Sequence, residues 1–257
     1  REDTNQLAII KHKYGLDRSI GNQYLLYIND ISPFSLHFHH EDSFTSLKKG
    51  KYSYTKLLET SSLSFVLKIP YLRESFVRLG MPVTCIIRDT FRNTFFLALS
   101  AVSIALVLGL FFGTLSALYK DTLFDKFILF ISVLGMSIPS FFASIIIAWI
   151  FGFILHSYTG LSMTGSLFEI DDYGTGSFLR LENLVLPAIT LGIRPLSVII
   201  QLCRNSLLEV LSSDYVRTAT SKGLSRFNVV SKHALRNALN PVITAVSGWL
   251  GSLLAGA

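Results

Sequence analysis

Two long runs without a charged residue constrain this chain more than any other feature. Residues 93–119 form an uncharged run of 27 residues, and residues 127–155 form a second run of 29. An α-helix rises about 1.5 Å per residue, so each run is long enough to cross a hydrocarbon core of about 30 Å. Residues 184–208 predict a third span, which Arg194 interrupts, and residues 241–257 begin a fourth. The sequence therefore predicts an all-α integral membrane protein.

Composition agrees with that fold class, and the distribution of charge predicts its orientation. Half of the residues are hydrophobic, only 16% are charged, and the mean hydropathy is +0.48. Residues 204–240 carry six Lys and Arg against two acids, whereas residues 156–183 carry one Arg against four acids. Because short cytoplasmic loops are enriched in Lys and Arg, we expect residues 209–240 inside and residues 156–183 outside. By alternation, residues 1–92 form an extracytoplasmic region and residues 93–257 form the membrane domain.

Residues 214–241 read as two short helices joined by a hinge. Gly223 lies where a left-handed residue can end the first helix, and Ser225 is a suitable N-cap for the second. Apolar residues recur on one stripe of that second helix at i, i+3 and i+4 spacing. The stripe comprises Phe227, Val230, Ala234, Leu235 and Ala238, and the polar positions off it are Arg226, Lys232, His233, Arg236 and Asn240. The pattern indicates a docking surface for a cytoplasmic partner, although a solvated basic loop would carry the same charges.

Four stretches of the chain form distinctive motifs. They are KYGLDRSIGNQYL from residue 13, SIPSF from residue 137, LVLPAITLG from residue 184, and YVRTATSKGLSRFNVVSKHALRNALNPVI from residue 215. Together they resemble the permease subunits of ABC transporters in the dipeptide, oligopeptide and nickel import family, and the last resembles that family's cytoplasmic loop nearly position by position. The family has six spans, so the resemblance implies a helical-bundle permease. We expect this chain to be a fragment with three complete spans and a partial fourth.

The resemblance implies a multi-pass subunit of an ATP-driven importer in the inner membrane of a bacterium, with an oligopeptide or dipeptide as the expected solute. Its partners would be a second permease (in a homo- or heterodimer), two ATP-binding subunits, an extracytoplasmic solute-binding protein and the lipid bilayer, with no nucleic acid, cofactor or metal. The coupling element would be residues 209–240. The positions carried over to it are Asp214, Tyr215, Arg217, Thr218, Ala219, Lys222, Gly223, His233 and Arg236.

The chain is not expected to be an enzyme. It lacks the motif G-x-x-x-x-G-K-S/T, which cradles nucleotide phosphates, so ATP hydrolysis is expected on separate subunits. An intramembrane hydrolase with Ser137 or Ser140 as the nucleophile would need a histidine at the same depth, and the spans supply none. An ATP-independent secondary transporter or channel subunit is the alternative function, with Arg194 as its only support.

Three residues within the predicted spans are candidates for lining a solute pathway. Arg194 lies about 15 Å along the third span from Leu184, near the bilayer midplane, where a charge is costly unless it is paired or hydrated. The alternative is a later start of the span, which would let Arg194 reach an interface. Pro139 removes a helical hydrogen bond and predicts a bend in the second span. Gln201 is the third candidate, at a position where the resembled family often has arginine.

Two further motifs admit more than one interpretation. Gly109 and Gly113 form a G-x-x-x-G motif, which allows close helix packing either within the chain or against another subunit. Residues 37–69 have no family counterpart that we recognise, and this apparent insertion contains HFHHED from residue 37. That cluster invites a nickel or zinc site, but it lacks the spaced Cys and His pairs of a closed site, so we favour a solvated loop.

Overall fold

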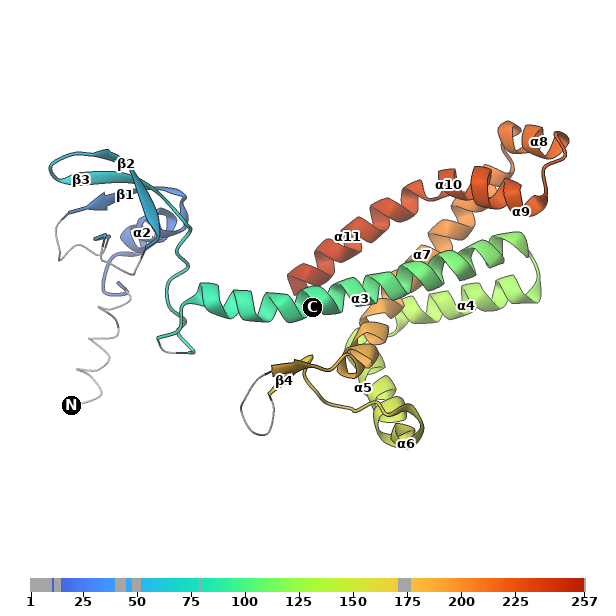
Figure 1. Ribbon diagram of the computed structural model, residues 1–257, viewed down its shortest axis with the longest axis horizontal. Helices are drawn as coiled ribbons and strands as arrows, with labels where there is room; N and C mark the ends of the chain where they lie inside the picture. The colour runs from blue at the N-terminus through green and yellow to red at the C-terminus, as the bar shows by residue number, and fades with distance from the viewer. Residues whose placement is uncertain are drawn as a thin grey trace. The chain divides into compact units, whose positions relative to one another are not determined.

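The computed structural model describes residues 11, 15–39, 45–47, 52–78, 80–170 and 177–256, which belong to two compact units (Figure 1). The first unit comprises Arg1–Asp89 and the second comprises Thr90–Ala257. The first contains a small sheet, whereas the second is mainly helical. The division falls three residues before the boundary at residue 92 that the charge pattern suggests.

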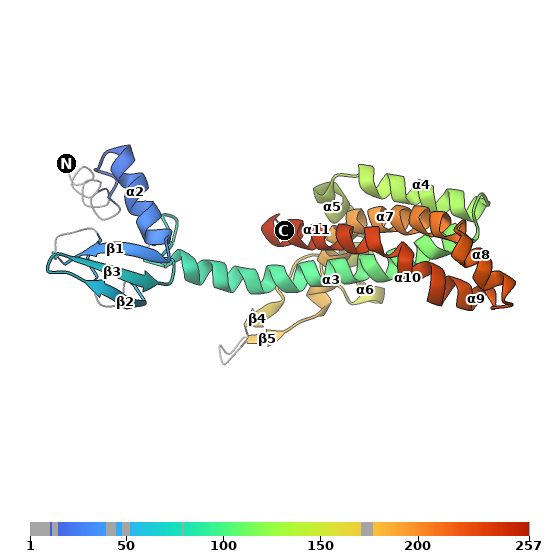
Figure 2. The same cartoon turned by 90° about the horizontal axis from the view of Figure 1, so that it is seen from above.

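A three-stranded antiparallel sheet and helix α2 (Ile20–Ile31) build the first unit (Figure 2). Its strands are β1 (Phe34–Phe38), β2 (Tyr54–Glu59) and β3 (Leu63–Lys68), in the spatial order β1-β3-β2. Phe34 lies opposite Leu67 and Phe38 lies opposite Leu63. The apparent insertion at residues 37–69 therefore contributes to all three strands.

Strand β1 buries polar side chains and exposes apolar ones. Ser35 and His37 of β1 are buried, while the alternate positions of that strand, Phe34, Leu36 and Phe38, are exposed. The His37 ring contacts the Ser35 hydroxyl through Nε2 at 2.9 Å and the Thr45 carbonyl through Nδ1 at 2.7 Å. Buried polar groups need such partners, so hydrogen bonds hold this face together. The expected solvated loop is wrong for His37, because the residue belongs to a buried strand face.

Asp30 organises the buried polar face from the end of α2. Its carboxylate accepts hydrogen bonds from the Tyr52 hydroxyl and from Arg73 Nε, both at 2.8 Å, and its backbone carbonyl accepts one from Lys68 Nζ at 2.6 Å. Burial, followed by the Asp30 carboxylate, raises the pKa of the Tyr52 phenol above its ordinary value. The hydroxyl is therefore protonated at neutral pH, and it ties α2 to the sheet.

Helices form most of the second unit (Figures 1 and 2). The chain enters it through α3 (Val83–Leu118), which turns into α4 (Leu123–Ser137). The following elements are α5 (Ser140–Trp149), the π-helix η1 (Ile150–Ile154), α6 (His156–Thr159), a short hairpin of β4 (Phe168–Ile170) and β5 (Ser177–Leu179), α7 (Glu182–Leu211), α8 (Asp214–Ser221), α9 (Arg226–Asn228), the π-helix η2 (Val229–Ala234), α10 (Leu235–Ala238) and α11 (Asn240–Gly256). The predicted helical membrane fold is confirmed, and the strands of the hairpin and of the first unit are additions to it.

Among the described residues, two helices are long and apolar enough to cross a membrane by themselves. They are α3, with 36 residues, and α7, with 30. Both begin before the spans predicted at residues 93–119 and 184–208, and α3 begins ten residues earlier. Two further pairs of helices qualify only if each bent pair is one span. These are α4 with residues Ser140–Ile154, bent by 108°, and Arg226–Ala238 with α11, bent by 51°.

The bend predicted at Pro139 is confirmed, and it divides the expected span at residues 127–155 into two helices. Helix α4 ends at Ser137 and α5 begins at Ser140, with Ile138 in an extended conformation between them. Proline cannot donate a backbone hydrogen bond and disfavours helix at the residue before it, which accounts for the break at Ile138. The reorientation of 108° is far larger than a kink in a continuous helix.

The G-x-x-x-G motif packs α3 against α7 of the same chain. A Cβ at Gly109 would lie 2.5 Å from Ile199 Cγ2, and one at Gly113 would lie 2.9 Å from the Ile200 carbonyl oxygen. Cys203 is also buried against Gly113. Only glycine permits such an approach, so the motif serves packing within the chain.

Candidate functional site

The predicted helix, hinge and helix are confirmed at residues 214–238. Helix α8 ends at Ser221, and Gly223 adopts a left-handed conformation with φ +79°. Ser225 then caps the next helix, because its hydroxyl accepts a hydrogen bond from the Asn228 backbone N–H at 3.4 Å. We call residues 214–238 the coupling segment.

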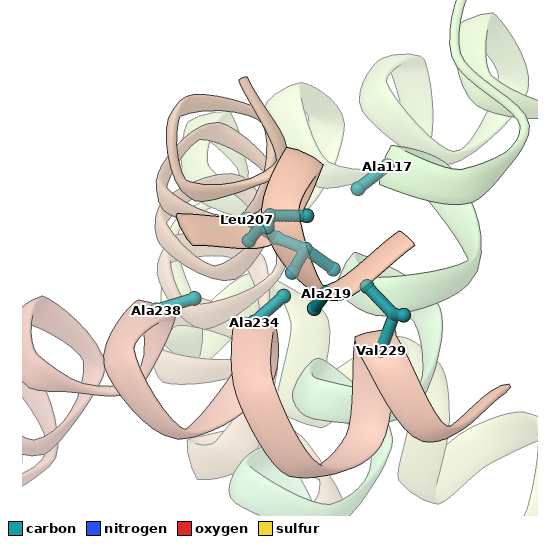
Figure 3. Packing of buried hydrophobic residues seen from close by; sticks show 7 residues of the cluster. Ala117, Leu207, Ala219, Val229, Ala234 and Ala238 are labelled. Carbon is teal, nitrogen blue, oxygen red and sulfur yellow. The ribbon is translucent and has the colours of Figure 1, made fainter. Parts of the chain in front are cut away.

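One face of the coupling segment is buried against the ends of two long helices (Figure 3). Small and medium apolar side chains on that face contact Ala117 near the end of α3 and Leu207 near the end of α7. They are Val216, Ala219, Val229, Ala234 and Ala238. Small side chains allow helices to approach closely, so this cluster fixes the coupling segment to both long helices.

The predicted apolar stripe is partly wrong. Val230, Ala234 and Ala238 are buried as expected and Leu235 is half-buried, but Phe227 is 78% exposed and Val229 takes a buried place instead. The π-helix η2 explains the difference, because its i→i+5 bonds alter the helical period that the sequence pattern assumes. Phe227 is thereby left on the surface beside Arg226.

The other face of the coupling segment is exposed and rich in polar side chains. Of the predicted site residues, Ala219 alone is buried. The exposed ones are Asp214, Tyr215, Arg217, Thr218, Lys222, Gly223, His233 and Arg236. Tyr215 joins the two halves of the coupling segment, since its hydroxyl accepts a hydrogen bond from Asn237 Nδ2 at 2.8 Å. The segment therefore presents a folded basic surface.

A largely apolar groove of about 480 Å³ lies between the end of α3 and the second half of the coupling segment. Leu115, Leu118 and Tyr119 line it from α3 and the residue after it, while Arg226, Phe227 and Val230 line it from the coupling segment. Arg226 Nη2 also donates to the Leu118 carbonyl at 3.4 Å. The exposed Phe227 ring borders this groove.

Arg204 and Asp125 form a buried ion pair that sequence reasoning missed. Arg204 Nε and Nη2 donate to the two Asp125 oxygens at 2.7 and 2.6 Å. The Ser116 hydroxyl and the Asp121 backbone N–H also donate to this carboxylate. The sequence offers no signal for the pair, because 79 residues separate its members and Asp125 reads as a charge in a short linker.

Arg194 and Pro139 lie at one place in the fold, and Gln201 does not. Arg194 lines a small cavity together with Ile138 and Ser140, the two neighbours of Pro139. Gln201 lies seven residues further along α7, where its Nε2 contacts Met136 Sδ at 3.4 Å. The structure thus brings two of the three candidate pathway residues together.

The histidine cluster gives no metal site within the part of the chain that the structure describes. His39 contacts the Ser64 hydroxyl at 2.5 Å and Glu59 at 3.6 Å. Among the described residues, no group of three or more His, Cys, Asp or Glu side chains is arranged to hold a metal ion. His40, Glu41 and Asp42 lie outside the described residues.

Comparison with known proteins places the chain in a family. Residues 105–257 match the model of the binding-protein-dependent transport system inner membrane component family. The chain is 32% identical over 252 residues to the dipeptide transport system permease protein DppB of Lactococcus lactis, an alignment that covers 98% of this chain and 66% of that protein. It is 32% identical over 273 residues to the di/tripeptide transport system permease protein DppB of Pseudomonas aeruginosa, covering 100% of this chain and 69% of that protein.

A third relative agrees. The chain is 31% identical over 243 residues to DppB of Bacillus subtilis, covering 95% of this chain and 62% of that protein. The chain thus spans about two thirds of the length of these relatives, and the alignment with the Pseudomonas protein includes residues 37–69. The chain therefore belongs to the binding-protein-dependent transport system inner membrane component family.

Proposed function

We propose that this chain is the permease subunit of an ATP-driven importer of short peptides. It forms the solute path with a second permease and transmits force from two ATPase subunits, while a solute-binding protein delivers the peptide from outside. The peptide class follows the names of the relatives, which include dipeptide and di/tripeptide permeases. ATP is hydrolysed on the partner subunits and not on this chain.

The two-faced coupling segment is the observation that carries this proposal. Its buried face is fixed to the ends of α3 and α7 by small side chains, and its exposed face offers Arg217, Lys222 and Arg236 to a partner. A solvated basic loop would not need a packed apolar face. A folded basic surface instead suits a partner whose docking cleft carries carboxylates.

Movement of the coupling segment would be transmitted to the spans through fixed contacts. The cluster around Leu207 joins the segment to α7, and Arg226 joins it to the end of α3. The Arg204–Asp125 ion pair connects α7 to the start of α4. A push on this end therefore displaces three helices as a group, which is the kind of rigid-body shift that alternating access requires.

The basic end of the helical unit is proposed to face the cytoplasm. The coupling segment and Lys126 share the end that holds the α3–α4 turn, whereas Glu169 and Glu182 lie by the β4–β5 hairpin at the start of α7 (Figure 1). The excess of Lys and Arg over acids at the first end favours this orientation. The unit Arg1–Asp89 would then be extracytoplasmic.

The solute path is proposed to pass the break between α4 and α5. Arg194 and the neighbours of Pro139 meet there, and Gln201 lies about two turns further along α7. Broken helices near the bilayer midplane are a recurring feature of solute sites in transporters. Gln201 would contact solute only at the end of the path nearer the coupling segment.

Reconstitution tests this function against the alternative of a secondary transporter. The full-length protein should co-purify with a second permease and an ATPase pair, and liposomes containing the complex should take up dialanine only with ATP and the binding protein. Uptake driven by an ion gradient without ATP would favour the secondary transporter. Absence of ATPase subunits from the purified complex would contradict the assigned role of the coupling segment.

A further inference from the structure

A cavity of about 160 Å³ lies at the break between α4 and α5. Four helices surround it, with Ile138 after the end of α4, Ser140 at the start of α5, Arg194 in α7 and Trp249 in α11. A water molecule occupies about 30 Å³ in the liquid, so the cavity has room for one end of a small solute and not for a long peptide.

Arg194 places a positive charge near the middle of the membrane-spanning helix. It is the thirteenth of 30 residues in α7, about 18 Å from the Glu182 end. Within the described residues the exposed Arg194 side chain has no ion pair or hydrogen bond, and the described acidic residues of the second unit lie near helix ends, in the α3–α4 turn or in β4. A charge at this depth is costly without a partner, so a counter-charge is expected from outside this chain.

Helix α5 adds positive potential to the same cavity. It begins at Ser140, and its N-cap residue Pro139 makes no side-chain hydrogen bond, in contrast to Thr122, which caps α4. The first backbone N–H groups of a helix lack partners within the helix, and they carry the positive end of its dipole. Ser140 and Ala143 line the cavity from this first turn. A guanidinium and an uncapped helix start thus converge on one small space.

We propose that this cavity is an anion subsite that binds the terminal carboxylate of a short peptide during transport. This rests on the proposed function, because it assigns the chemistry of one point on the solute path. Carboxylate is the planar anion that guanidinium binds with two parallel hydrogen bonds, and helix starts bind the same group. Lipid headgroups are poor candidates for the occupant, because they lie about 15 Å away at the bilayer surface.

Trp249 provides a direct probe, since it lines the cavity and the chain has one other tryptophan, Trp149. The assembled transporter carrying Trp149→Phe is placed in lipid nanodiscs and titrated with peptide, and the signal of a matched complex with Trp249→Phe is subtracted. The ligands are dialanine, alanyl-alaninamide, which has no carboxylate, and alanyl-aspartic acid α-amide (the alanyl-aspartamide), which keeps only its side-chain carboxylate. These three peptides separate a terminal carboxylate from an acidic side chain.

We expect dialanine to change the Trp249 fluorescence and to bind about 10- to 100-fold more tightly than the two amides, as loss of a charge-assisted hydrogen bond predicts. Arg194→Gln should remove that preference, Arg194→Lys should retain part of it, and Lys126→Gln should leave it unchanged. Equal binding of all three peptides, or no response of Trp249 in the Trp149→Phe protein with Arg194 unchanged, would overturn the subsite. If the alanyl-aspartamide binds as tightly as dialanine, the cavity binds acidic side chains, and its assignment to the terminal carboxylate is wrong.

Uptake measurements separate this inference from the proposed function. If the complex imports dialanine with ATP but Arg194→Gln preserves the peptide preference, the subsite is wrong and the importer stands. If the complex shows no ATP-dependent uptake but binds dialanine through Arg194, the importer is wrong and the subsite stands. The comparison of the three peptides is made with Arg194 unchanged, so it decides the inference even if Arg194→Gln fails to assemble.

Discussion

Arg204 and Asp125 form a bidentate ion pair that joins the second half of α7 to the first turn of α4. The two N···O distances are 2.7 and 2.6 Å, and both side chains are largely buried. Ser116 of α3 donates a hydrogen bond to the same carboxylate, so three helices meet at one charge. This relationship fixes the end of the helical unit on which the coupling segment is mounted.

Asp125→Ala should destabilise the protein by about 3–5 kcal/mol, because it leaves the Arg204 charge buried without a partner. Thermal unfolding of the purified protein in detergent measures the loss. Asp121→Asn is the matched control, since the exposed Asp121 side chain lies 3.9 Å from Lys120 and acts on Arg204 through charge alone, while its backbone N–H still donates to Asp125. The double variant Asp125→Leu with Arg204→Met should recover much of the stability, and failure of the control to remain stable would contradict this assignment.

The two glycines of the G-x-x-x-G motif should respond differently to alanine. A Cβ at Gly113 would meet the Ile200 backbone carbonyl, which cannot move easily, whereas a Cβ at Gly109 would meet the Ile199 side chain. Each substitution should cost about 1–3 kcal/mol through overpacking. Adding Ile199→Ala should relieve part of the cost of Gly109→Ala but none of the cost of Gly113→Ala.

Gly251→Ala serves as the control for the glycine series, because its added Cβ would meet no atom within 4 Å. Unfolding temperatures of the single and double variants in detergent measure the cost of each alanine and its relief by Ile199→Ala. Equal tolerance of alanine at Gly109, Gly113 and Gly251 would show that α3 and α7 do not pack as closely as the structure describes.

Much of the helical unit can be predicted from sequence, because its signals are local. The uncharged runs reveal α3 and the pair α4 and α5, and the apolar stretch around Arg194 reveals α7. Pro139, Gly223 and Ser225 mark a break, a hinge and a cap through backbone chemistry that each residue imposes by itself. The sheet of the first unit was not predicted. Its β1 strand buries Ser35 and His37 while exposing phenylalanines, so the usual link between hydrophobicity and burial fails there.

Other features of the candidate site depend on tertiary contacts and could not be predicted. The Arg204–Asp125 pair joins distant parts of the chain, and no local pattern identifies it. Phe227 was expected on the buried stripe, but the π-helix η2 changes the helical period and places Val229 there. The cavity beside Arg194 forms only when the break at Pro139 meets α7 and α11.

The proposed orientation predicts which positions an impermeant thiol reagent can reach in intact cells. In a background with Cys85→Ser, which removes the exposed native cysteine, Met163→Cys should be labelled from outside and Ser225→Cys should not. Both positions are exposed in the structure, so burial does not explain a difference between them. Permeabilised cells should label both, and reversed labelling in intact cells would invert the whole arrangement.

A matched pair of glycines tests whether Gly223 takes part in coupling. Gly223 and Gly160 both have a positive φ, at +79° and +66°, and a Cβ at either would meet no atom within 4 Å. Valine is strained in this backbone conformation at both sites, but only Gly223 lies in the coupling segment. Gly223→Val should therefore disturb the docking surface, whereas Gly160→Val should cause only the local strain.

The deciding measurement is peptide-stimulated ATP hydrolysis by the reconstituted transporter, recorded together with dialanine uptake. We expect Gly223→Val to lower uptake per ATP hydrolysed, or to weaken ATPase association, by about tenfold or more, which corresponds to a disturbance of about 1.4 kcal/mol or more. Gly160→Val should behave like the unsubstituted protein. Arg236→Glu should act in the same direction as Gly223→Val. Normal stimulation and normal uptake with both Gly223→Val and Arg236→Glu would contradict the role of the coupling segment.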